Sequence, residues 1–292
     1  MLPTERIAYS AIVDREPLKL PGGARMIVWT IVNLELWDIQ RPMARQVLPA
    51  PAGLSPLPDL PNWAWHEYGM RVGFWRLNAA LERFGVTPTV AINSAVCSAY
   101  PRVAKAALEG GWEFMGHGLL QKPVHQELDQ RGMIRASLDQ LRQFTGKPAL
   151  GWLGPGLTET LETPDLLAEA GIQYVGDWVL DDEPCEMLTR HGPLVTLPYT
   201  VELNDIPMMM VQHHSAQEFV TRSLDTFDRL YQESAGRAKV MAIAVHPYIS
   251  GAPFRIKYFE AVFEAMKAKP GVLFWTGEQI LKWYRGLRPR RA

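Results

Sequence analysis

The chain has 292 residues, 47% of them hydrophobic, which is enough to bury a large core as one barrel-sized domain or two smaller ones. Its 30 basic and 31 acidic residues give a formal charge of −1, so no bulk electrostatic field recruits nucleic acid or an anionic membrane. Two cysteines are too few for a disulfide framework, and no apolar run is long enough to span a membrane. Because the N-terminus also lacks a signal-peptide pattern, we expect a cytoplasmic protein.

The N-terminal half alternates predicted strands and helices. Residues 26–32 form an apolar run rich in β-branched side chains, which predicts a strand covered on both faces. The polar segment 1–25 before it is expected to be an N-terminal extension. Residues 37–69 contain many prolines and three tryptophans, and we expect an inserted aromatic loop over a site, with a plain surface excursion as the alternative. The next expected elements are a helix at 72–84, a strand at 87–92, a helix at 100–109 and a strand at 112–117.

The same alternation continues to the C-terminus. Further strands are expected at 149–153, 172–176, 194–198, 239–245 and 271–275. Further helices are expected at 125–144, 163–170, 216–234, 257–269 and 278–284. Strands that alternate with helices indicate a parallel α/β arrangement, and seven or eight such units favour a closed barrel over an open sheet. We therefore predict a single domain over residues 1–292, built as a distorted (β/α) barrel of seven or eight parallel strands.

Polar side chains follow most of the predicted strands where each strand ends. In chain order they are Asn33 and Glu35, His117 and Gln121, the segment Gly154-Pro-Gly156, Asp177 with Trp178, Asn204 with Asp205, and His246. Glycines on both sides of His117 allow a tight turn that aims the imidazole out of the sheet, although an ordinary loop histidine fits the same pattern. In a barrel of parallel strands all these residues lie on the C-terminal face, where such enzymes hold their chemistry.

Several of these segments resemble one known superfamily. They are Asn-Leu-Glu after the first strand, Gly-Val-Thr-Pro-Thr-Val-Ala-Ile-Asn, Gly-Trp-Glu-Phe-Met-Gly-His-Gly, Thr-Gly-Lys-Pro-Ala-Leu-Gly-Trp-Leu-Gly-Pro-Gly, and the late His-Pro. In this order they resemble the polysaccharide deacetylase (NodB-homology) superfamily, whose fold is a distorted (β/α) barrel. Within it the chain is more similar to the branch with peptidoglycan-deacetylase-like proteins, metal-independent allantoinases and cyclic imide hydrolases. The resemblance extends over residues 26–284, and its motifs are specific in combination but weak singly.

The resemblance carries over to the site residues with two departures. The superfamily's first motif has two aspartates, a general base and a metal ligand, at the positions of Asn33 and Glu35, and an amide cannot accept a proton at neutral pH. The second motif has two histidines four residues apart on the metal, at the positions of His117 and Gln121, and glutamine is a poor zinc ligand. The resemblance therefore implies one divalent metal, zinc before others, on Glu35, His117 and Gln121. Catalysis without a metal is the alternative.

Two mechanisms follow from these residues. In one, a metal on Glu35 and His117 activates a water and polarises the substrate carbonyl. In the other, Glu35 and His117 orient or deprotonate the water directly, and His246 protonates the departing nitrogen. His246 resembles the superfamily's late catalytic acid in both mechanisms, and a purely structural role is its alternative. Backbone N–H groups of the glycine-rich loop, at Gly154 and Gly156, are candidates for holding the oxyanion that forms as water adds.

The expected substrate pocket is apolar and closed. Tryptophans gather in the segments expected to cover the site: Trp37, Trp63, Trp65, Trp152 and Trp178. A closed apolar pocket with few polar groups suits a small ring, although tryptophans also stack on sugars or fill a core. Asn33 and Arg71 are further candidates to bind substrate, and a surface salt bridge is an equal alternative for Arg71.

Together these features predict an amidohydrolase that cleaves a non-peptide C–N bond in a small cyclic amide or imide. N-deacetylation of an amino sugar or of a peptidoglycan-type polysaccharide is the alternative. A non-catalytic relative that binds a metabolite or carbohydrate is a third hypothesis, because one fold hosts several roles. The expected partner is a small molecule, with no nucleic acid and no membrane. By resemblance the chain is a homo-oligomer, most often a tetramer, with the apolar face at 258–266 as a candidate interface.

Overall fold

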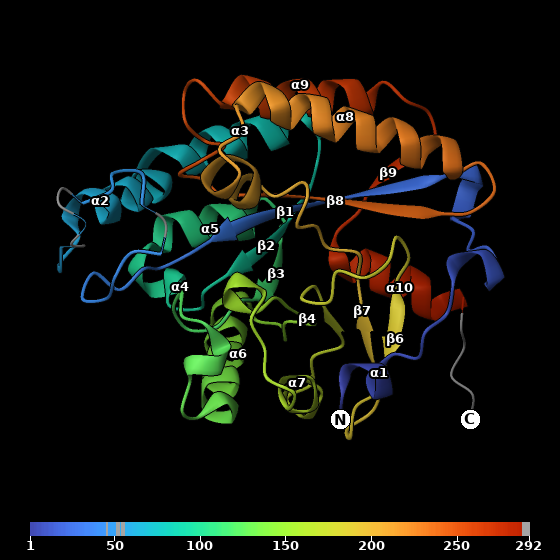
Figure 1. Ribbon diagram of the computed structural model, residues 1–292, viewed down its shortest axis with the longest axis horizontal. Helices are drawn as coiled ribbons and strands as arrows, with labels where there is room; N and C mark the ends of the chain where they lie inside the picture. Colours follow the sequence, from blue (N-terminus) through green and yellow to red (C-terminus); the bar gives the residue numbers. More distant parts are fainter. Residues whose placement is uncertain (45, 51–52, 54–55, 288–292) are drawn as a thin grey trace.

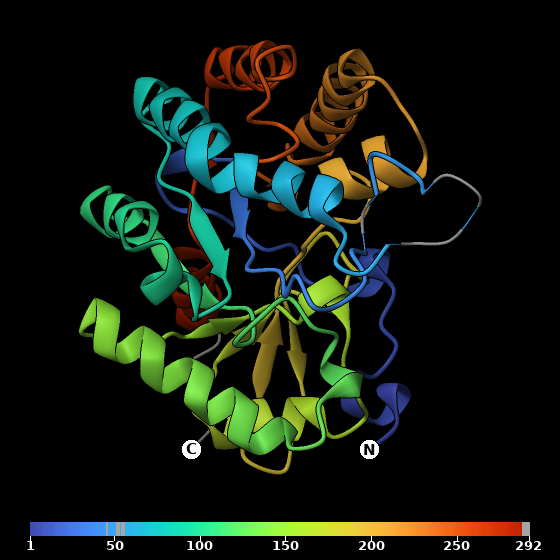
Figure 2. The ribbon, with the colours of Figure 1, turned by 90° about the vertical axis from the view of Figure 1, so that its left-hand side faces the viewer.

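The computed structural model describes residues 1–44, 46–50, 53 and 56–287, which form a curled sheet surrounded by helices (Figure 1 and Figure 2). The strands run in the order β6-β7-β5-β4-β3-β2-β1-β8, and β9 pairs with the start of β1. Every pair is parallel except β6 with β7. The strands are β1 (Met26–Leu34), β2 (Thr89–Ile92), β3 (Glu113–Gly116), β4 (Gly151–Trp152), β5 (Tyr174–Val175), β6 (Cys185–Met187), β7 (Leu194–Thr196), β8 (Lys239–Val245) and β9 (Val272–Phe274).

The helices lie outside the curled sheet, as the end-on view of Figure 2 shows. Their bounds are α1 (Pro3–Arg6), α2 (Leu60–Tyr68), α3 (Phe74–Phe84), α4 (Val96–Ala99), α5 (Pro101–Glu109), α6 (Gln130–Thr145), α7 (Thr163–Glu169), α8 (Ala216–Glu233), α9 (Ile256–Lys267) and α10 (Gly277–Leu287). Side chains cap the N-termini of the two longest helices. The Asp129 carboxylate accepts a hydrogen bond from Gly132 N before α6, and the Ser215 side chain accepts one from Glu218 N before α8. In the part of the chain described, no helix combines the length and apolar character needed to cross a membrane.

The core lies on both faces of β1, whose nine residues are all buried. Met26, Val28 and Val32 face the cluster formed with α3, α8 and α9, which lie along one side of β1 and β8 in Figure 1. Ile27 and Trp29 face the inside of the curled sheet. A strand buried on both faces reads as a continuous apolar run, and this is the pattern that identified it in the sequence.

The predicted fold class, a deacetylase-like (β/α) barrel, is confirmed, but the sheet is mixed and curled into a half-barrel. The difference is β6, which pairs antiparallel with β7 where the sequence indicated no strand. β6 has three residues, of which only Met187 is buried, so it carries neither an apolar run nor an alternation long enough to detect.

Part of the expected loop at 37–69 is helical. α2 begins after Asp59, whose carboxylate accepts from Asn62 N at 3.3 Å, and a proline lies in its first turn. α2 continues through the π-helical turn η4 (Gly69–Gly73) into α3. The prolines that favoured a loop in the sequence therefore belong partly to a helix start. Residues 45, 51, 52, 54 and 55 of this segment lie outside the described residues.

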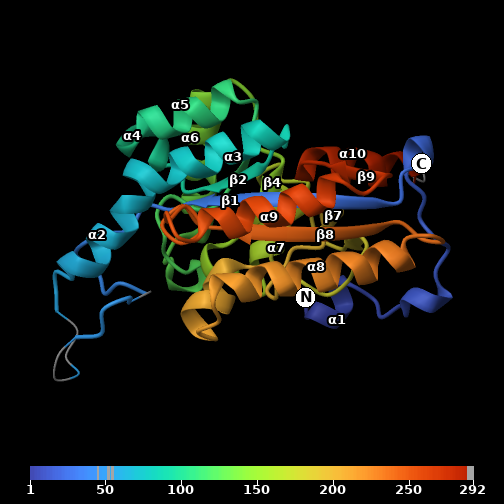
Figure 3. The same cartoon turned by 90° about the horizontal axis from the view of Figure 1, so that it is seen from above.

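Close backbone contact joins this helix to the segment after β8. A Cβ atom on Gly73 would lie 2.0 Å from the Pro247 carbonyl oxygen, and one on Gly69 would lie 2.7 Å from Tyr248 N. No side chain fits at either position, so the two glycines let η4 pack directly on the chain that follows His246. In the view from above, α2 extends past the C-terminal end of β1 (Figure 3).

The candidate interface at 258–266 is wrong for most of its length. Phe259, Val262, Phe263 and Met266 are buried in the core against β1, α3 and α8. Their helical spacing marks the inner face of α9, and spacing alone does not distinguish an inner face from an interface.

Candidate active site

The C-terminal ends of β1, β3 and β8 bring three of the predicted residues together. Glu35, His117 and His246 are 7%, 2% and 3% exposed. Glu35 Oε1 lies 3.4 Å from His246 Nε2 and 3.9 Å from His117 Nε2. Because β1 pairs with β2 on one side and with β8 on the other, the parallel register delivers all three side chains to one end of the sheet.

A buried aspartate holds His246. Asp205 is fully buried at the start of η7 (Ile206–Val211), and its Oδ1 lies 2.6 Å from His246 Nδ1. Its Oδ2 accepts from His246 N at 2.8 Å and from Ser250 Oγ at 2.6 Å. Burial lowers the pKa of His246, but Asp205 and then Glu35 raise it more, to about 9. At neutral pH His246 is therefore an imidazolium that can donate a proton.

Glu35 is the carboxylate that faces both histidines. Burial by itself would raise the pKa of Glu35, but the His246 and His117 side chains lower it by more. The pKa of this carboxyl therefore lies well below its usual range. Its Oε2 accepts from Trp37 Nε1 at 3.2 Å and from Tyr248 OH at 3.5 Å. Glu35 is thus ionised, with the two histidines near Oε1 and the Trp37 and Tyr248 donors on Oε2.

His117 is fixed through its other ring nitrogen. Its Nδ1 lies 2.5 Å from the Leu153 carbonyl oxygen, and a carbonyl only accepts, so Nδ1 carries the hydrogen. In the neutral ring Nε2 then has a lone pair, and it is buried without a hydrogen-bond partner among the described residues. Asn93 holds the backbone here, because its amide donates to the His117 carbonyl.

The predicted zinc ligands do not fit a metal centre. Among the described residues, no group of three or more His, Cys, Asp or Glu side chains is arranged to hold a metal ion. Gln121 Oε1 accepts from Asn93 Nδ2 at 3.3 Å, so the amide is engaged in fixing the loop. Glu35 and His117 supply two donors where a catalytic zinc site uses three from the protein. We therefore derive no step through a metal.

Four aromatic side chains cover Glu35. His66 lies between Trp37 and Tyr248, with ring centroids 4.7 and 4.4 Å away, and Trp65 contacts Tyr248 at 4.9 Å. We call Trp37, Trp65, His66 and Tyr248 the aromatic cover. Trp37 and Tyr248 also donate hydrogen bonds to Glu35, so the aromatic cover is bonded directly to the carboxylate. Trp65 therefore lies next to the site, as the sequence predicted for this segment.

Other predicted substrate-binding residues lie away from this centre. Trp152 is fully buried among the side chains of β4, β5 and α6, so it fills the core. Asn33 Nδ2 donates to the Val245 carbonyl at 3.3 Å and joins β1 to β8. Trp63 is half-buried on α2, and Arg71 is exposed on η4. Substrate contacts by these residues stay predictions, which Trp152 and Asn33 are poorly placed to fulfil.

The glycine-rich loop after β4 is engaged differently from the prediction. Leu153 N donates to the Gly116 carbonyl, and Gly154 N donates to Asp177 Oδ1 at 2.7 Å. Neither N–H group is free to hold an oxyanion, so Gly154 is wrong in that role. Gly156 has φ of 65° and lines a pocket.

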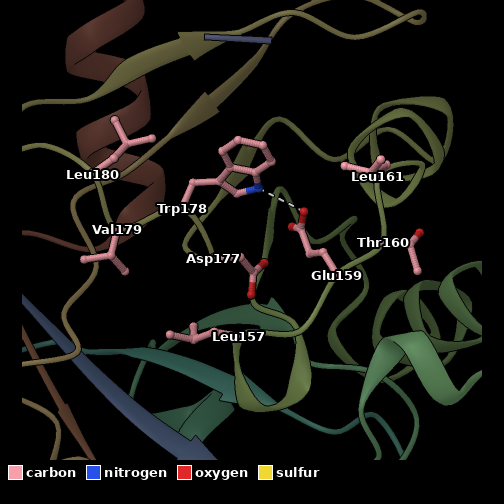
Figure 4. A pocket seen from close by; sticks show the side chains of 8 residues that line it. All are labelled: Leu157, Glu159, Thr160, Leu161, Asp177, Trp178, Val179 and Leu180. Atoms are coloured by element: carbon pink, nitrogen blue, oxygen red, sulfur yellow. Dashed lines mark hydrogen bonds between the residues drawn. The ribbon is translucent and has the colours of Figure 1, made fainter. Parts of the chain in front are cut away.

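Two hollows lie on this face of the barrel. One, of about 590 Å³, includes in its lining Trp37 of the aromatic cover and Gln121 of the loop after β3, and we call it the entrance pocket. Its other lining residues include Arg41, Lys122, Pro123, Pro155, Gly156 and Thr158. The second, of about 620 Å³, is lined by Glu159, Asp177, Trp178 and apolar neighbours (Figure 4). Trp178 Nε1 donates to Glu159 Oε2 at 2.9 Å, so this predicted residue belongs to the second hollow.

Asp205 binds His246 and Asp177 binds the Gly154 peptide, two contacts that sequence reasoning did not assign. Both aspartates stood among the polar residues at strand ends, which was the available signal. Their partners lie 41 residues away for Asp205 and 23 for Asp177, and no local pattern connects them.

Comparisons with known proteins agree with the fold, although no family profile matches the chain. A putative polysaccharide deacetylase of Schizosaccharomyces pombe is 26% identical and covers 98% of this chain and 92% of its own. A Helicobacter pylori peptidoglycan deacetylase is 24% identical over 64% of this chain and 75% of its own. The structure of a probable polysaccharide deacetylase from Pseudomonas aeruginosa PAO1 has a TM-score of 0.86 at 26% identity and covers 93% of this chain and 95% of its own. Puue allantoinase has a TM-score of 0.89 at 24% identity over 99% of both chains, a likeness of fold alone.

The half-barrel carries its polar residues on the C-terminal face, where (β/α)-barrel enzymes hold their catalytic groups. Sequence relatives over nearly the whole chain narrow that class. The chain is similar over nearly its whole length to polysaccharide deacetylases, in agreement with the resemblance that the sequence motifs indicated.

Proposed function

We propose that this protein hydrolyses the C–N bond of a small cyclic amide or imide. At the coarser level it is a hydrolase of carbon–nitrogen bonds other than peptide bonds, which its deacetylase relatives support. The observation that carries the finer proposal is enclosure: Glu35, His117 and His246 are all under 10% exposed beneath the aromatic cover. The adjoining entrance pocket, about 590 Å³, has the volume of a small-molecule site, whereas a polymer needs an open groove.

The side chains can activate water without a metal. Glu35 Oε1 and His117 Nε2 are two acceptors 3.9 Å apart, so a water bound to both is oriented toward a carbonyl carbon. The depressed pKa of Glu35 makes it a weak base, so Glu35 orients the water while the His117 lone pair takes its proton. The water oxygen forms the new bond to carbon.

His246 completes the reaction as the acid. Its imidazolium donates the Nε2 proton to the amide nitrogen as the C–N bond breaks, and Asp205 stabilises the cation beforehand. The products carry the hydroxyl on carbon and the proton on nitrogen. Proton transfer from His117 to solvent and from solvent to His246 restores the starting state.

N-deacetylation of an amino sugar or a peptidoglycan-type polysaccharide is the second candidate. The observation in its favour is that two curated relatives, 26% and 24% identical, are described as polysaccharide and peptidoglycan deacetylases. The same three side chains suit either reaction, since both cleave an amide C–N bond with water. The candidates differ in substrate size and therefore in the access that the aromatic cover allows.

Hydrolysis assays on succinimide, allantoin and N-acetylglucosamine oligomers, each with and without chelator, test the proposal. We expect turnover of a cyclic substrate, unchanged by chelator, with less than stoichiometric metal by elemental analysis. Turnover of the oligomers alone would establish the deacetylase instead. Loss of activity on adding chelator, together with stoichiometric metal in the purified protein, would overturn the metal-free mechanism. Absence of turnover on every small amide would favour a binding protein.

The pH profile tests the role of His246. Because the reaction requires protonated His246, we expect kcat/KM to fall as pH rises through about 9. Asp205→Asn removes the charge that most raises the pKa of His246, so the fall should move to lower pH. Asp182→Asn is the control, because the partly exposed Asp182 pairs with Lys239 at the start of β8, the opposite end of the strand from His246. An unchanged alkaline limb in Asp205→Asn would contradict the assignment.

A further inference from the structure

One peptide group lies between His117 and a second acidic residue. The Leu153 carbonyl is 2.5 Å from His117 Nδ1, and the N–H of the same peptide, on Gly154, donates to Asp177 Oδ1 at 2.7 Å. The peptide is thus bound at both ends, by the catalytic imidazole on one side and a carboxyl on the other. Asp177 has no part in the reaction described above, and it lies on the opposite side of this peptide from His117.

Hydrogen bonds in a chain polarise one another. A carboxyl oxygen that accepts from a peptide N–H draws positive charge to that end and makes the carbonyl at the other end a stronger acceptor. A stronger acceptor at Leu153 favours a hydrogen on His117 Nδ1. In the neutral ring, that hydrogen leaves Nε2 as the bare nitrogen that faces Glu35.

We infer that Asp177 is a positioning residue, which acts through the Leu153–Gly154 peptide to hold His117 in the Nδ1–H tautomer with Nε2 facing Glu35. The consequence for catalysis rests on the proposed function, because it requires His117 Nε2 to accept the proton of water. The tautomer itself is a property of the resting protein.

The surroundings of Asp177 suit this role. Figure 4 shows Asp177 and Glu159 side by side, with Trp178 bound to Glu159. Burial and then the nearby Glu159 raise the pKa of Asp177 well above its usual range. The geometry that carries the inference is the hydrogen bond that Asp177 Oδ1 accepts from Gly154 N.

Gly154 allows the contact. A Cβ atom there would lie 2.4 Å from the Thr158 carbonyl oxygen and 3.1 Å from Asp177 Oδ1. A side chain at this position would therefore separate the peptide from Asp177. This close approach gives a physical reason for the glycine that the sequence marked after β4.

Nitrogen NMR of histidine tests the inference directly. In two-bond proton–nitrogen spectra of the ¹⁵N-histidine protein, the His117 signals are identified by their loss in His117→Gln. We expect Nδ1 to be protonated and Nε2 bare in the wild type. Asp177→Ala should shift both signals toward the opposite tautomer and lower kcat about tenfold with little change in KM. Asp177→Asn keeps an acceptor for Gly154 N and should preserve the wild-type pattern.

Two further variants keep the test decisive. Val179 lines the same hollow as Asp177 but is not the acceptor for Gly154 N. The Val179→Ala variant should therefore leave the His117 spectrum and kcat unchanged. Asp177→Leu removes the acceptor but keeps a side chain branched at Cγ, in case the alanine variant fails to fold. A folded Asp177→Ala or Asp177→Leu protein with an unchanged His117 spectrum would overturn the inference. The spectrum needs no substrate, so failure of the proposed function in the hydrolysis assays is a separate result.

Discussion

Replacing Glu35 with glutamine is expected to lower kcat/KM by about 10³-fold. The amide cannot hold the water as a charged acceptor, and it no longer raises the pKa of His246, whose second-strongest supporting charge is Glu35. The alkaline limb of the pH profile should therefore move to lower pH in the residual activity. Steady-state kinetics on whichever cyclic amide the enzyme turns over provides the measurement.

Glu186→Gln, an exposed change on β6, is the matched control and should retain full activity. Thermal melts of both variants show whether the fold is intact. A folded Glu35→Gln protein that keeps more than a tenth of the wild-type kcat/KM would remove Glu35 from the mechanism.

Replacing Arg6 with alanine is expected to lower the free energy of unfolding by about 3–5 kcal/mol. Arg6 is 1% exposed, and its guanidinium donates to both Asp165 carboxylate oxygens, at 3.2 and 2.7 Å, and to the carbonyls of Leu188 and Leu161. Its removal leaves a carboxylate that is itself only 6% exposed without its main partner. Denaturant unfolding measures the loss.

Arg229→Ala is the control, because Arg229 pairs with Glu233 on the surface of α8 and its loss should cost about 0.5 kcal/mol or less. The pH dependence gives a second check. The Arg6 hydrogen bonds outweigh burial and lower the pKa of Asp165 to about 2. This stabilisation is fully present above the unfolded-state pKa of about 3.9 and is lost as pH falls through about 2. An equal loss in both arginine variants would contradict a special role for Arg6.

The long central strands β1 and β8 were predictable because a strand buried on both faces has a recognisable apolar pattern in its local sequence. β8 was expected at 239–245 and is found at Lys239–Val245, and β1 extends its predicted run by two residues. Both are buried on two faces, so each reads as an uninterrupted apolar run. β4 and β5 have two residues each, and the sequence placed them but made them longer. Flanking residues such as Leu153 and Gln173 make backbone hydrogen bonds to neighbouring segments but do not lengthen the strands, which a sequence pattern does not reveal.

The convergence of the three candidate catalytic residues was predictable for a similar reason. Glu35, His117 and His246 each follow a strand, and parallel strands present their C-terminal ends on one face. The zinc set failed at Gln121, whose amide binds Asn93. Trp152 is poorly placed to contact substrate because it fills the core, and an apolar ring at a strand end fits a core and a pocket equally well in a sequence pattern.

Local sequence thus determined the α/β barrel class, the order of its elements and the three polar strand ends, because each depends on residues close together in the chain. The pairing of Asp205 with His246, the relay from Asp177 to His117 and the anchoring of Arg6 on Asp165 were decided by the tertiary structure. Each joins side chains from separate elements in a buried environment. Such contacts arise when the sheet curls and expels water, and only then do these charged groups find the partners that set their protonation and orientation.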